Sequence, residues 1–469
     1  MGMTFTRMPF AVIRVPLICV AAMQAHATTI IVTNTNDSGP GSLRQALTIA
    51  HDGDVITFAV NGTIALISGG LPITRNVTIS GPGADQLSID GNQGLLVFGV
   101  FPQKTAAISG LTIMNAEAGV WNQGTVAVSN CVLTGNSDGL LNQLGIVTLT
   151  SCVLSGNSYS GLYSEGVSTV SDSIISGNSD AGLFNNVHHG PPLLFPFQSP
   201  SSEPAAGYGS MTITDSIIRD NSRSGILNYG SLTVLNSTVS GNSTDEGYAG
   251  GGISSGTFKA PASVIVVNST ISGNSASGGG GGIANSYWGV TIVNSTISGN
   301  SAGDAGGAIA NYGGGVQIAN STVSGNSAPS GGGINNVSGP FGGTLETGNT
   351  IFNRGASGEN IVNSGTITSD GYNICSDDGG GLLNAPGDQI NTDPLLGPLQ
   401  DNGGPTLTHA PLPHSPAIDA GNPNFTPPPS RDQRGPCYYR VFGRRIDVGS
   451  VETQPRPRCV SPAPRPTPR

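Results

Sequence analysis

Apolar and polar residues alternate along short stretches in the middle of the chain. In the segment 232–236, Leu232 and Val234 fall on one side of an extended backbone, and Val239 returns to that side after a turn. Alternation with a period of two is typical of a strand that buries one face. We therefore expect short strands, joined by tight turns, whose Val, Ile and Leu side chains point into a common interior.

The alternating stretch recurs in eight segments with the sequence Asn-Ser-Thr-Ile-Ser-Gly-Asn-Ser or a variant of it. The segments begin at residues 130, 151, 172, 215, 236, 268, 294 and 320, mostly 21 or 26 residues apart. A period in the twenties without helical periodicity is typical of a β-solenoid. Each coil has room for three short strands, which predicts three stacked parallel sheets. Because parallel crossovers are generally right-handed, the expected fold is an all-β, right-handed parallel β-helix.

Stacking places equivalent residues of successive coils about 4.8 Å apart. One repeat position is predicted to form a ladder of amide hydrogen bonds, and it holds Asn136, Asn157, Asn178, Asn221, Asn242, Asn274, Asn300 and Asn326. The second position of the motif is predicted to point inward, with Cys131 and Cys152 as buried, unbridged thiols. An outward hydroxyl face is expected beside it, made of Thr238, Thr270, Thr296 and Thr322 with Ser240, Ser272, Ser298 and Ser324.

Both ends of the repeat carry signs of a cover. Ser42-Leu-Arg-Gln45 is a capping-box pattern, and Leu43, Ala46 and Leu47 follow at helical spacing, which predicts a short capping helix. The repeat decays after about residue 365, where proline-rich sequence predicts an irregular C-terminal cap. Between two motifs, the proline-rich stretch 187–207 is expected to be a loop that extends out of the coils.

The N-terminus has the pattern of an export signal. Arg7 and Arg14 supply a positive region, an apolar run covers 15–23, and Ala25-His26-Ala27 gives a small-x-small cleavage site. Residues 1–27 are therefore expected to be a signal peptide, and the mature chain is expected to be extracellular or on the outer cell surface. No later segment has the pattern of a transmembrane helix. In that oxidising compartment a Cys437–Cys459 disulfide is more plausible than one between Cys131 and Cys152, and the pairing among Cys375, Cys437 and Cys459 remains open.

Composition and charge narrow the function classes. Glycine makes up 71 of 469 residues, only 10% of residues are charged, and the formal net charge is −10. Between residues 105 and 340 the cations are Arg219, Arg223 and Lys259. This excludes the basic stripe of a nucleic-acid binder and leaves few cations for clamping acidic sugars. The basic residues after Arg431 alternate with proline and are interpreted as a tail.

At this point the sequence resembles a known group. The segments 32–47 (VTNTNDSGPGSLRQAL) and 53–58 (GDVITF) resemble the N-terminus of bacterial right-handed β-helix surface proteins. The segments 392–422, 432–435 (DQRG) and 447–449 (DVG) resemble the choice-of-anchor Q domain. The resemblance implies an exported, often surface-held, pectin-lyase-like β-helix. It carries no agreed catalytic residues, and relatives usually bear an anchoring segment after the Q domain, where this chain has only its Pro/Arg tail.

Together these patterns predict four parts of the chain. Residues 1–27 are the signal peptide, 28–365 the β-helix with its N-terminal cap and the loop at 187–207, 366–454 the choice-of-anchor-Q-like region, and 455–469 a disordered Pro/Arg tail.

Candidate chemistry is sparse along the repeats. Lyases of this fold need a basic residue, usually with acidic residues that hold Ca²⁺, and the best local set is Arg219 and Arg223 with Asp215 and Asp220. A solvated charged turn is the preferred interpretation of that set.

Other candidates are pairs in turns or loops. A hydrolase needs paired carboxylates, and the adjacent acidic pairs are Asp377-Asp378 and Asp245-Glu246. His188-His189 lack a third metal ligand close in sequence. Two roles remain open for four residues of the C-terminal motif: binding a cation, or forming hydrogen bonds with backbone groups of the turns. These residues are Asp419, Asp432, His409 and His414. We therefore assign no catalytic, cofactor-binding or metal-binding residue, and Ca²⁺ has no supporting motif.

Three functions remain open. The first is a non-enzymatic secreted or cell-surface β-helix that acts in adhesion, as an adhesin, or binds an extracellular polysaccharide or host glycan. The second is a divergent polysaccharide lyase or glycoside hydrolase with its cleft near the loop at 187–207. The third is a binder of ice or hydroxylated surfaces through the Thr/Ser face.

Overall fold

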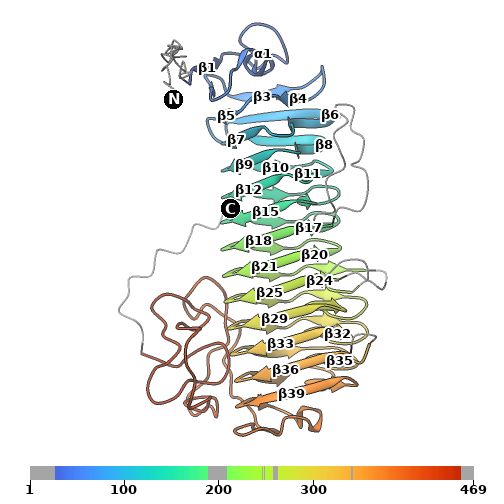
Figure 1. Ribbon diagram of the computed structural model, residues 1–469, viewed down its shortest axis with the longest axis vertical. Coiled ribbons are helices and arrows are strands. Elements are labelled where there is room, and N and C mark those ends of the chain that lie inside the picture. Colours follow the sequence, from blue (N-terminus) through green and yellow to red (C-terminus); the bar gives the residue numbers. More distant parts are fainter. Residues whose placement is uncertain are drawn as a thin grey trace, which may run out of the picture.

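A computed structural model describes residues 27–187, 209–245, 247, 249–256, 262–339 and 342–455. Within these residues the chain winds into a right-handed parallel β-helix whose coils stack along one long axis (Figure 1). Three ladders of parallel strands run along that axis, here called ladders A, B and C, as the repeat predicts. No helix among the described residues is both long and apolar enough to cross a membrane.

Ladder A contains fourteen strands. They are β1 (Thr29–Val32), β2 (Val55–Phe58), β5 (Val77–Ser80), β7 (Thr105–Ser109), β9 (Thr125–Ser129), β12 (Ile146–Thr150), β15 (Val167–Ser171), β18 (Ser210–Thr214), β21 (Ser231–Leu235), β25 (Ser263–Val267), β29 (Gly289–Val293), β33 (Gly315–Ala319), β36 (Thr344–Gly348) and β39 (Thr366–Gly371).

Ladder B contains the motif strands. They are β3 (Gly62–Ala65), β6 (Leu87–Val100), β8 (Thr112–Asn122), β10 (Val132–Thr134), β13 (Val153–Ser155), β16 (Ile174–Ser176), β19 (Ile217–Arg219), β22 (Thr238–Ser240), β26 (Thr270–Ser272), β30 (Thr296–Ser298), β34 (Thr322–Asn326), β37 (Ile351–Arg354) and β40 (Ile374–Cys375).

Ladder C completes each coil. It shares the long strands β6 and β8 with ladder B and adds β4 (Leu71–Ile73), β11 (Asp138–Asn142), β14 (Leu162–Ser164), β17 (Ala181–Asn185), β20 (Ser224–Asn228), β24 (Ile253–Ser255), β28 (Ile283–Ser286), β32 (Ile309–Tyr312), β35 (Ile334–Val337) and β38 (Ile361–Asn363). A short extra ladder joins β23 (Ser243–Thr244), β27 (Ser275–Ala276) and β31 (Ser301–Ala302).

The core is a continuous stack of aliphatic side chains inside the coils. Leu232 pairs with Val264, and Val239 pairs with Ile271, so each residue meets its counterpart one coil away. Leu232, Val234 and Val239 are all buried, which confirms the predicted phase of alternation. Burial of apolar surface at about 25 cal/mol per Å² is the main stabilising contribution in such a stack.

The predicted asparagine ladder is present and fully buried. From Asn136 to Asn300, each Nδ2 donates to the Oδ1 of the next coil, for example from Asn221 to Asn242 at 2.8 Å and from Asn242 to Asn274 at 2.9 Å. The backbone N–H of Asn242 also donates to Oδ1 of Asn274 at 3.0 Å. A second ladder, which the repeat motif did not reveal, follows ladder C, where Asn285 donates to Asn311 at 2.7 Å.

The inward Cys/Ser column is also confirmed. Cys131 and Cys152 are buried free thiols, and the backbone N–H of Cys152 donates to Oγ of Ser173 at 3.1 Å. Burial raises the pKa of the Cys131 thiol to about 12, which makes it inert. Cys437 is disulfide-bonded, whereas its predicted partner Cys459 lies outside the described residues.

The N-terminal cap has the predicted form. Helix α1 (Leu43–Ile49) begins after Ser42, whose side chain accepts from the N–H of Gln45, and it buries Leu43 and Leu47. The Gln45 side chain accepts in turn from the N–H of Gly41 at 2.7 Å. The helix therefore covers the open first coils, where unpaired strand edges would otherwise be exposed.

The C-terminal region has two parts. Strands continue past residue 365 without the repeat motif: β39 pairs with β36, with a register shift between Thr347 and Gly348, and β40 pairs with β37. The following turns, with the 3₁₀ helix η1 (Gly379–Gly381), place Leu383 against the core and close the last coil. The remaining chain does not extend this cap. It folds back along the side of the lower coils (Figure 1).

The predicted export signal, the loop at 187–207 and the Pro/Arg tail fall almost entirely outside the described residues. Of these three segments, the structure describes only Ala27, Val187 and Pro455. These assignments stay predictions.

Candidate functional site

The Thr/Ser face of ladder B is covered by the C-terminal region. Thr296 donates to Oε1 of Gln433 at 2.6 Å, and Nε2 of Gln433 donates to Oγ1 of Thr270 at 2.9 Å. Ser450 lies within hydrogen-bond distance of Thr296 (3.0 Å) and donates its N–H to Oγ1 of Thr322 (3.1 Å). Gly449 lies so close that a Cβ there would stand 2.9 Å from Oγ1 of Thr322.

The expectation of an open hydroxyl face on these coils is therefore wrong. Thr270, Thr296 and Thr322 are at most 1% exposed, and only Thr238 keeps part of its surface. A regular column of hydroxyls with unfilled hydrogen-bonding capacity attracts any polar segment that can match its spacing, and here that segment belongs to the same chain.

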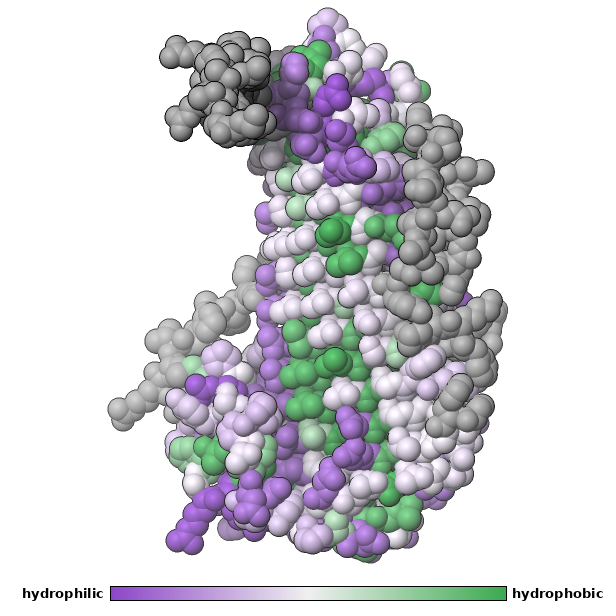
Figure 2. All heavy atoms as spheres, viewed as in Figure 1, coloured by the Kyte–Doolittle hydropathy of each residue, from purple (hydrophilic) through white to green (hydrophobic). Residues whose placement is uncertain are grey.

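Threonines that reach solvent, fully or in part, lie on ladder A instead. Thr148, Thr169, Thr212 and Thr233 occupy one outward column on successive strands. Figure 2 shows the front of strands β12–β21 as a mostly pale band with hydrophobic patches. Strands β9 to β33 of this ladder contain no charged residue.

The C-terminal motif residues mainly satisfy backbone groups. Asp432 is buried, accepts from the N–H groups of Arg434 (2.9 Å) and Glu452 (2.9 Å), and pairs with the Arg434 guanidinium at 2.5 Å. His409 is held between the carbonyl of Gly397 (2.7 Å) and Oγ of Ser298 (2.8 Å). Burial lowers the pKa of the His409 imidazole.

The structure does not bring these four side chains of the C-terminal motif together in a common site. Asp419 donates its backbone N–H to Asp447 at 2.7 Å, and His414 is exposed in a turn. Across the described residues there is no group of three or more His, Cys, Asp or Glu side chains that could hold a metal ion.

The predicted set around Arg219 is not brought together. Arg219 pairs with its neighbour Asp220 at 2.9 Å on the surface, and Asp215 occupies the turn between ladders A and B. Arg223 turns away from both and pairs with Asp180 on the preceding coil at 3.2 Å.

The acidic pairs in turns have local roles. Asp377 accepts from Sγ of Cys375 at 3.0 Å and from the N–H of Asn360 at 2.8 Å, and Asp378 caps η1. Asp245 is exposed directly after β23. Glu246 and the pair His188-His189 lie outside the described residues.

A cluster that the sequence analysis missed lies at the corner between ladders B and C. We call Asp138, Tyr159, Ser160, Asp180 and Arg223 the Asp138 cluster. These side chains come from four successive coils, because Asp138 begins β11 and the others precede β14, β17 and β20. The Ser160 hydroxyl donates to Oδ1 of Asp138, and the Ser160 N–H donates to the same oxygen at 3.3 Å.

The side chains of the Asp138 cluster differ in burial and in their charged neighbours. Burial raises the pKa of the Asp138 carboxyl to about 6, and the carboxylates of Asp180 and Glu117 add to the rise, although the Ser160 hydroxyl opposes it. Asp180 is buried beside the half-exposed Arg223 guanidinium. Tyr159 is 36% exposed, so the cluster opens to solvent at this side chain.

An aromatic row lies next to the cluster on the outer face of ladder C. It consists of Tyr163, Phe184 and Tyr229, with ring centroids 4.9 Å and 5.4 Å apart in edge-to-face contact. Leu162 and Leu183 point inward, so the alternation of the strands turns Tyr163 and Phe184 outward. The Tyr163 hydroxyl also donates to Glu165 at 3.2 Å.

One signal in the sequence marks these residues. Asp138, Tyr159, Asp180 and Arg223 are each the second residue after a ladder asparagine. Reading that phase across coils would have placed four titratable side chains in one column.

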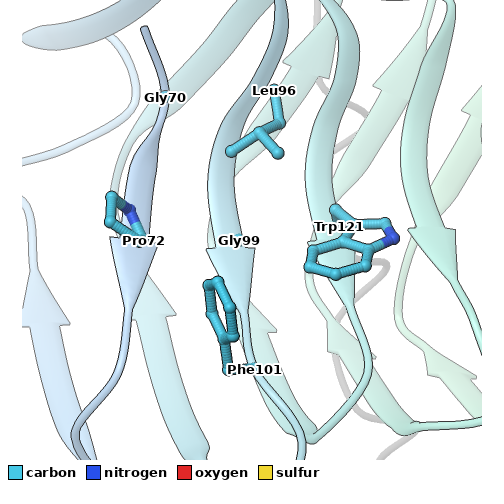
Figure 3. A pocket seen from close by; sticks show the side chains of 6 residues that line it. All are labelled: Gly70, Pro72, Leu96, Gly99, Phe101 and Trp121. Carbon is cyan, nitrogen blue, oxygen red and sulfur yellow. The ribbon is translucent and has the colours of Figure 1, made fainter. Parts of the chain in front are cut away.

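A small apolar pocket ends the row near the N-terminal coils. Figure 3 shows Phe101 and Trp121 on neighbouring strands, with Pro72 and Leu96 beside them. Its volume of about 10 Å³ has room for about one water molecule, which excludes a sugar ring. Trp121 donates from Nε1 to Gln143 at 3.1 Å, so its ring is fixed as part of the wall.

Comparisons with known proteins concern the fold. No protein-family model matches the chain and no curated protein matches it, so the choice-of-anchor Q assignment stays a prediction. Among solved structures, pectate lyase Pel9A is 15% identical, with a TM-score of 0.42 over 91% of this chain and 96% of that chain.

Two other solved structures are similar at the same level. The GH87 α-1,3-glucanase of Streptomyces thermodiastaticus is 14% identical, with a TM-score of 0.47 over 72% of this chain and 67% of that chain. The A-module of the mannuronan C-5 epimerase of Azotobacter vinelandii is 16% identical, with a TM-score of 0.42 over 74% and 88%. The parallel β-helix fold of this chain rests on its own ladders of parallel strands, and neither a family nor an activity is carried over from these structures.

Proposed function

We propose that the protein is exported and binds an extracellular polysaccharide along the outer corner of ladder C. The observation that carries this proposal is the contact of the Asp138 cluster with solvent beside the aromatic row. Carboxylates accept hydrogen bonds from sugar hydroxyls, and aromatic faces pack against the apolar faces of sugar rings. The cluster holds more carboxylates than cations, which favours a neutral glycan.

The test is a binding screen of the mature protein against neutral and acidic polysaccharides. Asp180→Asn keeps the size of the side chain but removes its charge, and Tyr163→Ala removes the half-buried ring of the aromatic row. Both substitutions are expected to weaken binding of the glycan that the wild-type protein binds in the screen. Asp304→Asn, an exposed carboxylate at the far end, is the matched control. Equal binding by all variants would contradict the proposal.

Hydrolysis of the bound glycan is a second candidate, favoured by one observation. Asp138 has a pKa of about 6, so its carboxyl carries a proton at mildly acidic pH and can act as a general acid. Asp180 lies two coils away, about 10 Å along the axis of the β-helix, where a second carboxylate could activate water. Arg223 is paired with Asp180, which leaves it poorly suited to serve as the base of a lyase.

Product analysis separates these functions. A hydrolase releases reducing ends without unsaturated sugars, and both Asp138→Asn and Asp180→Asn should abolish that release. A protein that only binds gives no product with any variant. Export is tested separately by N-terminal sequencing of the secreted protein, which should begin near Thr28, and fractionation shows whether it is held at the surface.

A further inference from the structure

An open pocket of about 350 Å³ lies at the N-terminal end of the β-helix, between α1 and β4. This volume is at the lower end of the range for small-molecule sites. Its walls combine Arg44, Thr48, Thr74 and Arg75 with an apolar floor that includes Leu71. It lies three coils before the Asp138 cluster, since β4 pairs with β6, β6 with β8 and β8 with β11.

The two guanidinium groups of the pocket differ in their partners. Arg44 is held in place: Nη1 donates to Gly70 O at 2.8 Å, and Nη2 pairs with Asp37 at 2.6 Å. Arg75 is exposed, donates only to the carbonyl of Thr74 at 3.3 Å, and makes no ion pair with a described residue. Arg75 therefore brings an uncompensated positive charge to the pocket.

The other walls suit a sugar ring. Oγ1 of Thr48 donates to Arg44 O at 2.8 Å and keeps its lone pairs for a hydroxyl donor, and Thr74 is exposed beside it. Pro72 is exposed above the fully buried Leu71, so the Pro72 ring supplies the C–H groups of the floor. A ring with hydroxyls on its edge, an apolar face and an acidic substituent would contact each of these surfaces.

We propose that this pocket binds an anionic sugar residue, whose carboxylate or sulfate pairs with Arg75 and whose hydroxyls contact Thr48 and Thr74. The inference goes beyond the proposed function, because it concerns a separate site with the opposite charge preference. In a chain with a net charge of −10, an acidic glycan is repelled at long range, so a local cation decides where it binds.

The experiment is titration calorimetry of the full mature chain with three oligosaccharides of equal length: an oligouronate, a sulfated oligomer and a neutral glucan. Arg75→Gln should weaken binding of the anionic oligomers about tenfold, as expected when a charge-assisted hydrogen bond is lost. Arg75→Lys should retain most of the affinity, and added salt should reduce it. Whichever anionic oligomer depends on Arg75 identifies the acid group.

Arg354→Gln is the matched control. Arg354 is exposed on β37 at the opposite end of the β-helix, and its replacement by Gln changes the net charge by the same amount as Arg75→Gln. Loss of affinity that is equal in both variants would overturn the proposal, as would a wild type that binds neither anionic oligomer. Neither result would affect the proposed binding of a neutral glycan at the Asp138 cluster, which is tested by the dependence of that binding on Asp180. The two sites are therefore tested independently.

Discussion

Gln433 bridges two coils of ladder B by accepting from Thr296 through Oε1 and donating to Thr270 through Nε2. The two threonines belong to paired strands, and one side-chain amide matches their spacing. This contact fixes the C-terminal region on the face that the repeat leaves rich in hydroxyls.

Replacing Gln433 should loosen the C-terminal region. Gln433→Leu would leave two buried hydroxyls without these partners, and we expect the free energy of unfolding to fall by about 2 kcal/mol. Chemical denaturation measures the change, and limited proteolysis should cut within residues 393–452 sooner. Gln317→Leu, an exposed site on ladder A, should stay within about 0.5 kcal/mol of wild type. An unchanged Gln433 variant would show that the contact contributes little.

The asparagine ladder should be sensitive at its centre. Asn242→Ala removes the acceptor of Asn221 and a donor to Asn274 within the buried interior. We expect a loss of about 2–3 kcal/mol, because unpaired polar groups then remain buried. The exposed Asn384→Ala is the control and should have almost no effect in thermal or denaturant unfolding. A loss below about 0.5 kcal/mol would mean that the ladder does not stabilise the coils.

Docking of the C-terminal region should weaken in acid. Burial holds the pKa of His409 below its ordinary value, so the unfolded segment binds more protons once the pH falls below about 6.5. Stability from this group is present above that pH and lost below it. Proteolytic susceptibility of residues 393–452 should therefore rise between pH 7 and pH 5, and His409→Gln should reduce the change. His414→Gln, in an exposed turn, should retain the wild-type profile.

The carboxyl of Glu452 should lower the stability of the folded protein as the pH rises, whereas His409 lowers it as the pH falls. Burial raises the pKa of its carboxyl to about 8, so the folded region favours the protonated form. Its contribution is fully present below the unfolded value of about 4.5 and is lost as the pH rises through 8. Glu452→Gln should flatten the decline in thermal stability between about pH 5 and pH 8. A decline of the same slope in the variant would assign the effect to another group.

Much of the helical part could be predicted because its contacts are periodic. Asn242 and Asn274 share one phase of the motif, so their pairing follows from counting residues, as does the inward position of Cys152. The same counting places Asp138 and Asp180 in one column, although neither belongs to a pair of acidic residues adjacent in sequence.

The position of the C-terminal region could not be predicted from the repeat. Gln433 contacts Thr270 across 163 residues, and no periodicity links the two segments. The threonines were correctly assigned to the outer face, but burial there depends on a long-range contact. The pKa of Asp138 likewise depends on burial and on side chains from neighbouring coils rather than on its own segment.

The most direct test of the account is the affinity of wild type, Asp180→Asn, Tyr163→Ala and Asp304→Asn for the polysaccharide that the screen selects. We predict that the first two substitutions each weaken binding about tenfold, with folding unchanged by circular dichroism, and that Asp304→Asn binds as wild type does. Wild-type affinity in the Asp180 and Tyr163 variants would contradict a glycan site at the corner of ladder C.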